Sequence, residues 1–403
     1  MVNGNSVILQ IGEESVWGER ADCTEQIKIS QESFKPVYNK VDEGLATGGR
    51  GAGMKQTMGI RAEGAFSTLF RPDMGLLLKC LCGVEESVRD NLDGTFTHIF
   101  HAIGTSVSDS LPSLTVKVSR IVSNFAYTGC KIGEMSFNAA AADYLKTDVT
   151  IAGRLEESGI QMESLRPSAR KAFRFAGGKV KIDGEEVADV TSMELSYNNN
   201  LDSETQTTDT GDYYKESECG VRNLTTNLEM LYSAGAERIR ALLYKTDNTF
   251  AIEFVYTSDE KCNGVDVLFD SFDSFAQTAK KIADGVKYGE DESEENGIIW
   301  EHAGVQYCQK GAESEEIYTF TGDTQTQIEC AQTATDILKL VKETTDGKPY
   351  TLKIKIPCNQ VSEASANMGG LETLKQTLSA DAVDNLEDEL VTFELTNDYS
   401  EKY

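Results

Sequence analysis

The sequence has few of the residues that usually build catalytic or metal-binding centres. It contains three histidines and two tryptophans among 403 residues. On a strand His98 and His101 would point to opposite faces, so they are poorly placed to bind one metal ion. The nine cysteines include no C-x-x-C pair, the spacing typical of zinc and thiol-redox sites. We therefore expect no metal, no cofactor and no enzymatic activity.

Segments that direct proteins into or across membranes are also lacking. The most apolar run, GLLLKCLCG at residues 75–83, is far shorter than the roughly 20 residues that span a bilayer. The first residues carry no basic segment followed by an apolar one, so we expect no secretory signal. The cysteines are then expected to be reduced and mostly buried, as in proteins that fold in a cytosol.

Basic residues are scarce relative to acidic ones. The chain has 38 Lys and Arg against 66 Asp and Glu, giving a formal net charge of −28. Such a charge repels nucleic acid and anionic membranes, which excludes a sequence-reading DNA-binding protein and a membrane partner. A hydrophobic share of 39% is nevertheless that of a folded globular protein.

One glycine-rich stretch, ATGGRGAGMKQT at residues 46–57, resembles a phosphate-binding loop only superficially. Met54 follows Gly53 where the P-loop needs lysine, and Gln56 follows Lys55 where it needs serine or threonine. The next segment alternates as a strand does, whereas a phosphate site needs a helix N-terminus. We therefore interpret the stretch as the tip of a long hairpin loop between a strand near Val37 and a strand beginning at Gly59.

Period-two alternation of apolar and polar residues recurs along the chain and predicts a mainly β fold. The order strand, long polar loop, strand, helix occurs twice: residues 59–81 align with 220–243 at an offset of 161 to 162, and 130–153 align with 358–382. This indicates a duplication of one β-sandwich or barrel module with a flanking helix. The expected domains are a first module at 1–160, a second module at 161–257 and 350–403, and an inserted domain at 258–349.

The expected insertion, residues 258–349, has no counterpart in the first half. It contains the acidic run GEDESEENG and two stretches with helical spacing, residues 273–289 and 333–345. We expect an α+β surface decoration here, because exposed loops tolerate insertions.

Several segments, in this order and spacing, resemble tandem-type phage tail tube proteins. They cover most of the chain outside the insertion and are LQIGEESVWGERADCTEQIKISQESFKP, MGLLLKCLCG, GTFTHIF, LTVKVSRI, FAYTGCKIGEMSFNAAAADYLKTDVTIAGR, FRFAGGKVKIDGEEVADVTSMELSYNNNLDSE and LEDELVTFELTND.

The resemblance implies a structural protein of the virion tail, assembled in the host cytoplasm. Modules of this family join their sheets edge to edge into closed rings, and the rings stack into a hollow tube through which double-stranded DNA passes during ejection. Three copies of a two-module chain would give a pseudo-sixfold ring, and six copies remain an alternative. The implied partners are further copies of the chain and the tape measure, tail terminator and baseplate proteins. Acidic residues lining the lumen would keep DNA from sticking.

In the resembled family the loop equivalent to 46–57 contacts the neighbouring ring. The candidate stacking residues are Gly48, Gly49, Arg50, Gly51, Gly53 and Lys55. The counterpart loop of the second module contributes Asp209, Asp212, Tyr213, Tyr214 and Lys215. The alternatives are a related baseplate hub, the tube of a contractile bacteriocin, and a carbohydrate-binding or adhesion module.

Overall fold

The computed structural model describes most of the chain in two compact units. The described residues are 4–45, 53–91, 94–104, 110–241, 249–262, 280–288, 294–302, 305–309, 317–321, 329–330, 348–367, 374–385 and 388–403. The first unit comprises 1–89, 97–260 and 350–403, and the second comprises 90–96 and 261–349. The expected division into two modules and an insertion remains a prediction.

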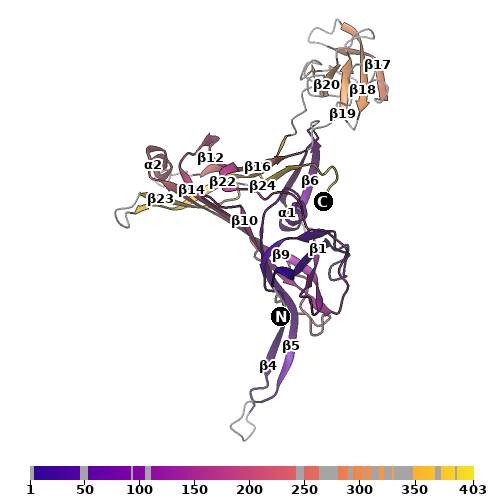
Figure 1. The fold of residues 1–403 in the computed structure, drawn as a ribbon, viewed down its shortest axis with the longest axis vertical. Coiled ribbons are helices and arrows are strands. Elements are labelled where there is room, and N and C mark those ends of the chain that lie inside the picture. Colours follow the sequence, from indigo (N-terminus) through magenta and orange to yellow (C-terminus); the bar gives the residue numbers. More distant parts are fainter. Residues whose placement is uncertain are drawn as a thin grey trace. The chain divides into compact units, whose positions relative to one another are not determined.

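The chain is mainly β, as expected, and its strands form one large antiparallel sheet in the first unit (Figure 1). The strands before the middle of the chain are β1 (Ile8–Glu13), β2 (Glu25–Ile27), β3 (Ile29–Glu32), β4 (Lys35–Asp42), β5 (Lys55–Leu69), β6 (Gly83–Asp90), β7 (Phe96–Ala102), β8 (Leu114–Ser119), β9 (Asn124–Ala140), β10 (Lys146–Gly153) and β11 (Leu155–Ser158). The later strands of this sheet are β12 (Gly178–Ile182), β13 (Glu185–Glu186), β14 (Val190–Asn198), β15 (Asn223–Leu231), β16 (Thr249–Lys261), β22 (Pro349–Asn367), β23 (Lys375–Ala382) and β24 (Thr392–Asn397).

The strand order repeats along the sheet. In the first half the order is β4–β5–β10–β9, and in the second half it is β14–β15–β23–β22. β9 pairs with β14, so the two sets form one continuous row of strands, which we call the main sheet. The first half also contains a second row of strands, β1–β8–β9–β11, which shares β9 with the main sheet. The second half contains the row β12–β16–β22–β24, which shares β22 with the main sheet in the same way.

An irregularity recurs at the same place in both halves. In β9, one residue between Ile132 and Glu134 has no partner in β10. In β22, one residue between Val361 and Glu363 has no partner in β23. The unpaired position in β22 lies 229 residues after the one in β9, since 361 − 132 and 363 − 134 are equal. A β-bulge bends its strand, and both strands run on from the main sheet into the second set of strands.

One face of the main sheet is buried against a core that both halves share. Phe137 on β9 lies 5.5 Å from Phe70 and 5.8 Å from Phe393 on β24, measured between ring centroids. The helix α1 (Gly75–Cys82) packs beside β9 with both of its cysteines buried. It ends at Gly83, whose φ of 103° is the left-handed conformation that favours glycine.

His98 is a structural residue of this core. Its Nδ1 lies 2.8 Å from Glu85 Oε1, and its Nε2 lies 3.1 Å from Asn397 Oδ1. The ring is fully buried, and these hydrogen bonds satisfy both of its nitrogens. They join β7 to β6 and to the end of β24.

The expectation of helix over residues 273–289 is wrong where the structure describes it. Lys280–Tyr288 is strand β17, paired with β18 (Glu294–His302); the remaining strands of the second unit are β19 (Val305–Gln309), β20 (Ile317–Thr321) and β21 (Glu329–Cys330). The pairing of β17 shifts register three times, so its apolar residues do not alternate strictly and their spacing resembles that of a helix. The second helical stretch, 333–345, lies outside the described residues.

The second flanking helix, expected at the end of the aligned segment 220–243, is α2 (Ala234–Arg240). It begins after Ser233, which caps it by accepting a hydrogen bond from the Ala236 N–H.

Candidate assembly surface

A long two-stranded hairpin extends from the first set of strands. β4 and β5 pair from Lys35 opposite Glu63 out to Asp42 opposite Lys55. β10 covers β5 only from Ala62 onward, so among the described residues the outer part of β5 has β4 alone as its strand partner (Figure 1). A hairpin that leaves its sheet in this way buries little surface by itself.

This hairpin exposes large apolar side chains. The exposed fractions are 52% for Tyr38, 44% for Val41, 72% for Leu45, 91% for Met54 and 44% for Met58. Scattered apolar residues are normal on a protein surface, but five on one short ribbon mark a surface that suits a protein partner.

The equivalent segment of the second half, between β14 and β15, is a compact loop. We call residues 199–222 the second-half loop. Its two ends are joined by the Asp202 N–H, which donates to the Glu218 carbonyl at 2.9 Å, and within it the Lys215 N–H donates to the Thr205 carbonyl at 2.8 Å. The loop therefore folds back on itself through backbone hydrogen bonds of its own, as compact surface loops do.

The second-half loop packs onto the hairpin. The Ile60 N–H donates to the Asp212 carbonyl at 2.7 Å. The Tyr214 ring lies over Gly59, where an added Cβ would be 2.4 Å from the tyrosine oxygen. A larger residue at this strand position would displace the Tyr214 ring from where it lies.

Arg61 adds a charged contact between the same two segments. Its guanidinium donates to the Glu204 carboxylate and lies 5.8 Å from the centre of the Tyr214 ring. Burial works against the charge of Arg61, but the hydrogen bond to Glu204 and nearby acidic groups outweigh it and raise the pKa of the guanidinium. The residue stays cationic at any working pH.

The other end of the second-half loop is anchored by a buried lysine. Lys131 on β9 is 1% exposed at its side chain, and its Nζ lies 2.7 Å from Glu216 Oε1. The same group donates to the Ser217 carbonyl at 3.0 Å. Between the two ends, Arg154 stacks on the Tyr213 ring at 5.6 Å. The loop is thus fixed at several points by residues of the first half.

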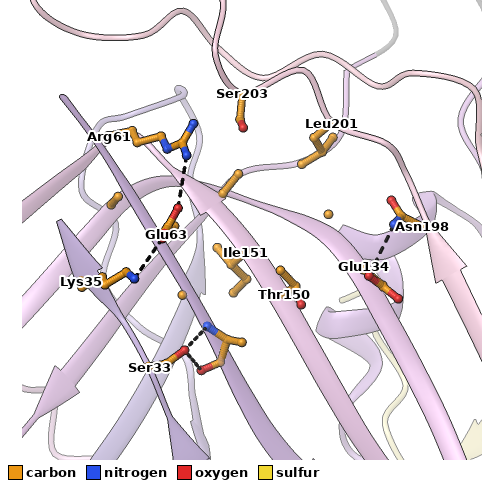
Figure 2. Close-up of a pocket in the computed structure, with 15 residues that line it drawn as sticks. Ser33, Lys35, Arg61, Glu63, Glu134, Thr150, Ile151, Asn198, Leu201 and Ser203 are labelled. Carbon is orange, nitrogen blue, oxygen red and sulfur yellow. Dashed lines mark hydrogen bonds and ion pairs between the residues drawn. The ribbon is translucent and has the colours of Figure 1, made fainter. Parts of the chain in front are cut away.

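A polar cavity of about 410 Å³ lies at the root of the hairpin (Figure 2). Glu63 stands between two cations there, 3.2 Å from Lys35 and 3.4 Å from Arg61. Across the cavity Glu134 accepts a hydrogen bond from Ser196 at 2.8 Å. These charges are partnered, and the cavity walls come from both halves of the chain.

The open face of the main sheet is polar, and its acids outnumber its bases. The acids are Glu63, Glu134, Asp148, Glu194, Glu229, Glu363 and Asp381, and the bases are Lys35, Arg61, Lys146 and Lys375. Each base lies in an ion pair with an acid. Most other positions hold serine, threonine or asparagine, so the net charge of the face is negative.

The structure places the candidate residues as follows. Gly48, Gly49, Arg50 and Gly51 lie outside the described residues, while Gly53 and Lys55 lie at the outer end of the hairpin. In the second-half loop, Asp212, Tyr213 and Tyr214 meet first-half residues. Lys215 pairs instead with Glu218 at 2.6 Å within the loop, which raises the pKa of its amine. Asp209 accepts a hydrogen bond from the Thr207 hydroxyl at 2.5 Å.

Three contributors were missed from the sequence: Gly59, Arg61 and Glu204. A glycine inside a strand pattern signals a close approach of another group, so Gly59 could have been found. Arg61 and Glu204 are 143 residues apart and carry no local signal.

A family model described as phage tail tube protein matches residues 4–299. The chain belongs to the phage tail tube protein family. This tail tube protein is therefore a structural component of the virion tail that self-assembles into a tube. The family is one of structural proteins rather than enzymes. No curated protein matches the chain.

Two further findings concern other site types. Within the described ranges, no group of three or more His, Cys, Asp or Glu side chains is placed to hold a metal ion. No helix among the described residues is long and apolar enough to cross a membrane.

Proposed function

We propose that this chain is the major tail tube subunit and that three copies close head to tail into a ring. The observation that carries the proposal is the join between the halves. β9, the last strand of the first set, pairs with β14, the first strand of the second set, over seven residues. The chain therefore already contains one contact of the kind that a ring needs to repeat.

The two outer strands of the main sheet offer the matching edges. β3 and β4 begin the row, and the outer part of β22, Glu363–Asn367, ends it. Among the described residues no strand covers the other side of that part of β22. Unpaired edges of this length invite pairing, and closure of a ring removes them.

The internal join also gives a register for the closing contact. β22 positions equal β9 positions plus 229, and first-half positions equal second-half positions minus 161. With these shifts, the internal pair Ser136 and Ser196 predicts that Ser365 lies opposite Lys35 of the partner subunit. The pair Glu134 and Asn198 becomes Glu363 and Val37 of the partner subunit by the same shifts.

In such a ring the open face of the main sheet lines the lumen. Its uncompensated acids repel the phosphate backbone, and its hydroxyl and amide groups offer no fixed cation, so DNA passes without being held during ejection. Screening restricts this repulsion to about 8 Å at physiological salt. The hairpin, with its exposed apolar residues, then supplies the contact between stacked rings.

A cysteine-pair experiment tests the closing contact. Ser365→Cys and Lys35→Cys are introduced together, tubes are assembled and oxidised, and the products are separated without reductant. Facing residues of neighbouring strands have Cβ atoms about 5 Å apart, so we expect a ladder of linked chains that stops at three.

The matched control carries Ser365→Cys with Gln31→Cys, which moves one thiol four residues along the edge, about 13 Å. Each single variant reports background linking by the natural cysteines. Linking in the control but not in the test pair would disprove the register, and a ladder reaching six would replace the three-chain ring with a six-chain one.

A further inference from the structure

We infer that the second-half loop is a brace for the first-half hairpin, so that each chain presents one stacking hairpin instead of two. The inference rests on the proposed tube function only where it predicts an effect of the brace on tube assembly. The inference itself concerns two segments of one chain and the contacts between them.

The hairpin needs support that its own sheet does not give. Among the described residues, β4 is the only strand of the sheet that pairs with residues 55–61 of β5. Met54, just before this segment, and Met58, within it, are exposed and contribute no core. A two-stranded ribbon is marginally stable by itself in water, so its direction depends on contacts at its root.

The second-half loop supplies those contacts on one side of β5. The hydrogen bond from Ile60 to Asp212 and the parallel bridge between Ile60 and Tyr213 extend the pairing of the ribbon by one short segment. The Tyr214 ring fills the space over Gly59, and Arg61 is bonded to Glu204. Because Lys131 holds the far end of the loop, these contacts connect the ribbon to the buried sheet.

The same contacts explain why the second half has no hairpin of its own. The second-half loop has 24 residues, from 199 to 222, which is enough for two strands, yet its chain folds back on itself and onto β5. In a ring of three chains the stacking hairpins then number three rather than six. The tube would combine a pseudo-sixfold inner wall with threefold contacts between rings.

Two variants test the brace. Tyr214→Ala removes the ring over Gly59, and Gly59→Ala places a methyl group where the ring lies. Combining them relieves the clash, so the double variant should behave as Tyr214→Ala does. Tyr144→Ala, which removes another exposed tyrosine from the same unit, is the matched control.

The first measurement is amide hydrogen exchange of residues 55–61 in the unassembled chain. We expect exchange about tenfold faster in Tyr214→Ala and in Gly59→Ala than in the wild type and in Tyr144→Ala. Unchanged exchange in properly folded variants, judged by circular dichroism, would overturn the brace. This readout does not depend on whether tubes form.

The second measurement is the rate of tube growth, followed by light scattering and negative-stain microscopy. Slower growth in both variants supports the brace as an assembly device, whereas normal growth with faster hairpin exchange would overturn that role. A wild-type protein that forms no tubes would instead contradict the proposed function and leave the exchange result standing as the test of the brace.

Discussion

The hairpin of the first half and the loop of the second half occupy the same place in a repeated strand order and have different structures. Both follow the first strand of their set and precede the second. One extends as paired strands with exposed apolar residues, and the other folds back and bonds to it. We infer from this difference that the two predicted modules have taken different roles, one making the outward contact and the other orienting it.

The same division is visible at the root of the hairpin. Glu32 in the first half corresponds to Met193 in the second, since each lies opposite an equivalent strand residue, Phe66 or Leu228. Met193 is buried with its sulfur next to the Tyr256 hydroxyl, whereas Glu32 accepts two hydrogen bonds from Arg120 at 2.8 and 2.9 Å. An ion pair thus holds the hairpin root where packing suffices in the other half.

The largest expected effect comes from the outer end of the hairpin. Arg50→Glu with Lys55→Glu reverses two charges that would meet acidic groups of the next ring. We expect unfolding stability within about 0.5 kcal/mol of wild type, as for most surface changes, and no tube growth by electron microscopy. The control, Lys171→Glu with Lys179→Glu, makes the same charge change at exposed lysines outside the hairpin. Normal tubes from the hairpin variant would refute the stacking role.

A smaller effect is expected at the anchor of the second-half loop. Lys131→Met removes the buried ammonium and leaves the Ser217 carbonyl without its donor. We expect a loss of about 1–3 kcal/mol in the free energy of unfolding, measured with urea. Lys181→Met is the control, because its partner Glu253 and its own side chain are partly exposed, and surface pairs contribute about 0–1 kcal/mol. If Lys131→Met and Lys181→Met lose the same free energy of unfolding, the buried Lys131 contributes no more than a partly exposed lysine and does not anchor the loop.

The smallest effect concerns pH at the hairpin root. Burial tends to raise the pKa of Glu32, but the hydrogen bonds from Arg120 and the Phe34 N–H outweigh it and lower that pKa below its ordinary value. A lowered carboxyl pKa stabilises the fold above the unfolded value and loses this contribution as pH falls through the folded one. We expect Glu32→Gln to cost about 1–2 kcal/mol at pH 7.

The cost of Glu32→Gln should shrink as the pH falls below about 4, because the carboxyl is protonated first in the unfolded chain and, at lower pH, in the folded one too. Urea unfolding at pH 7 and at pH 3 checks this. A pH-independent difference would mean that packing, rather than the charge, accounts for the contribution of Glu32.

Much of the fold was predictable from local pattern. Alternation gave strands such as β8 and β15, and the Asp183-Gly184 turn has both residues at positive φ, 51° and 81°, as a tight hairpin requires. The repeat was visible because equivalent strands keep their apolar positions, with Phe66 matching Leu228. Where bulges break the alternation, as in β17, the same reasoning gave a helix and was wrong.

The assembly surface was less predictable, because its contacts join distant residues. The glycine stretch predicted a hairpin between two strands, and β4 and β5 on either side of it do pair. The repeated strand order likewise supports the long loop of the second half as its counterpart. That the counterpart would fold onto the hairpin depends on Gly59 with Tyr214 and on Arg61 with Glu204, pairs separated by more than 140 residues. No local periodicity encodes such pairs.

A three-dimensional reconstruction by electron microscopy of particles assembled from the purified protein tests the central claim most directly. We predict hollow tubes of stacked rings, each with three chains joined by β22 and the β3–β4 edge, with the polar face of the main sheet lining the lumen and three hairpins crossing to the next ring. Dispersed monomers under all conditions, or rings whose lumen is lined by another face, would contradict the account.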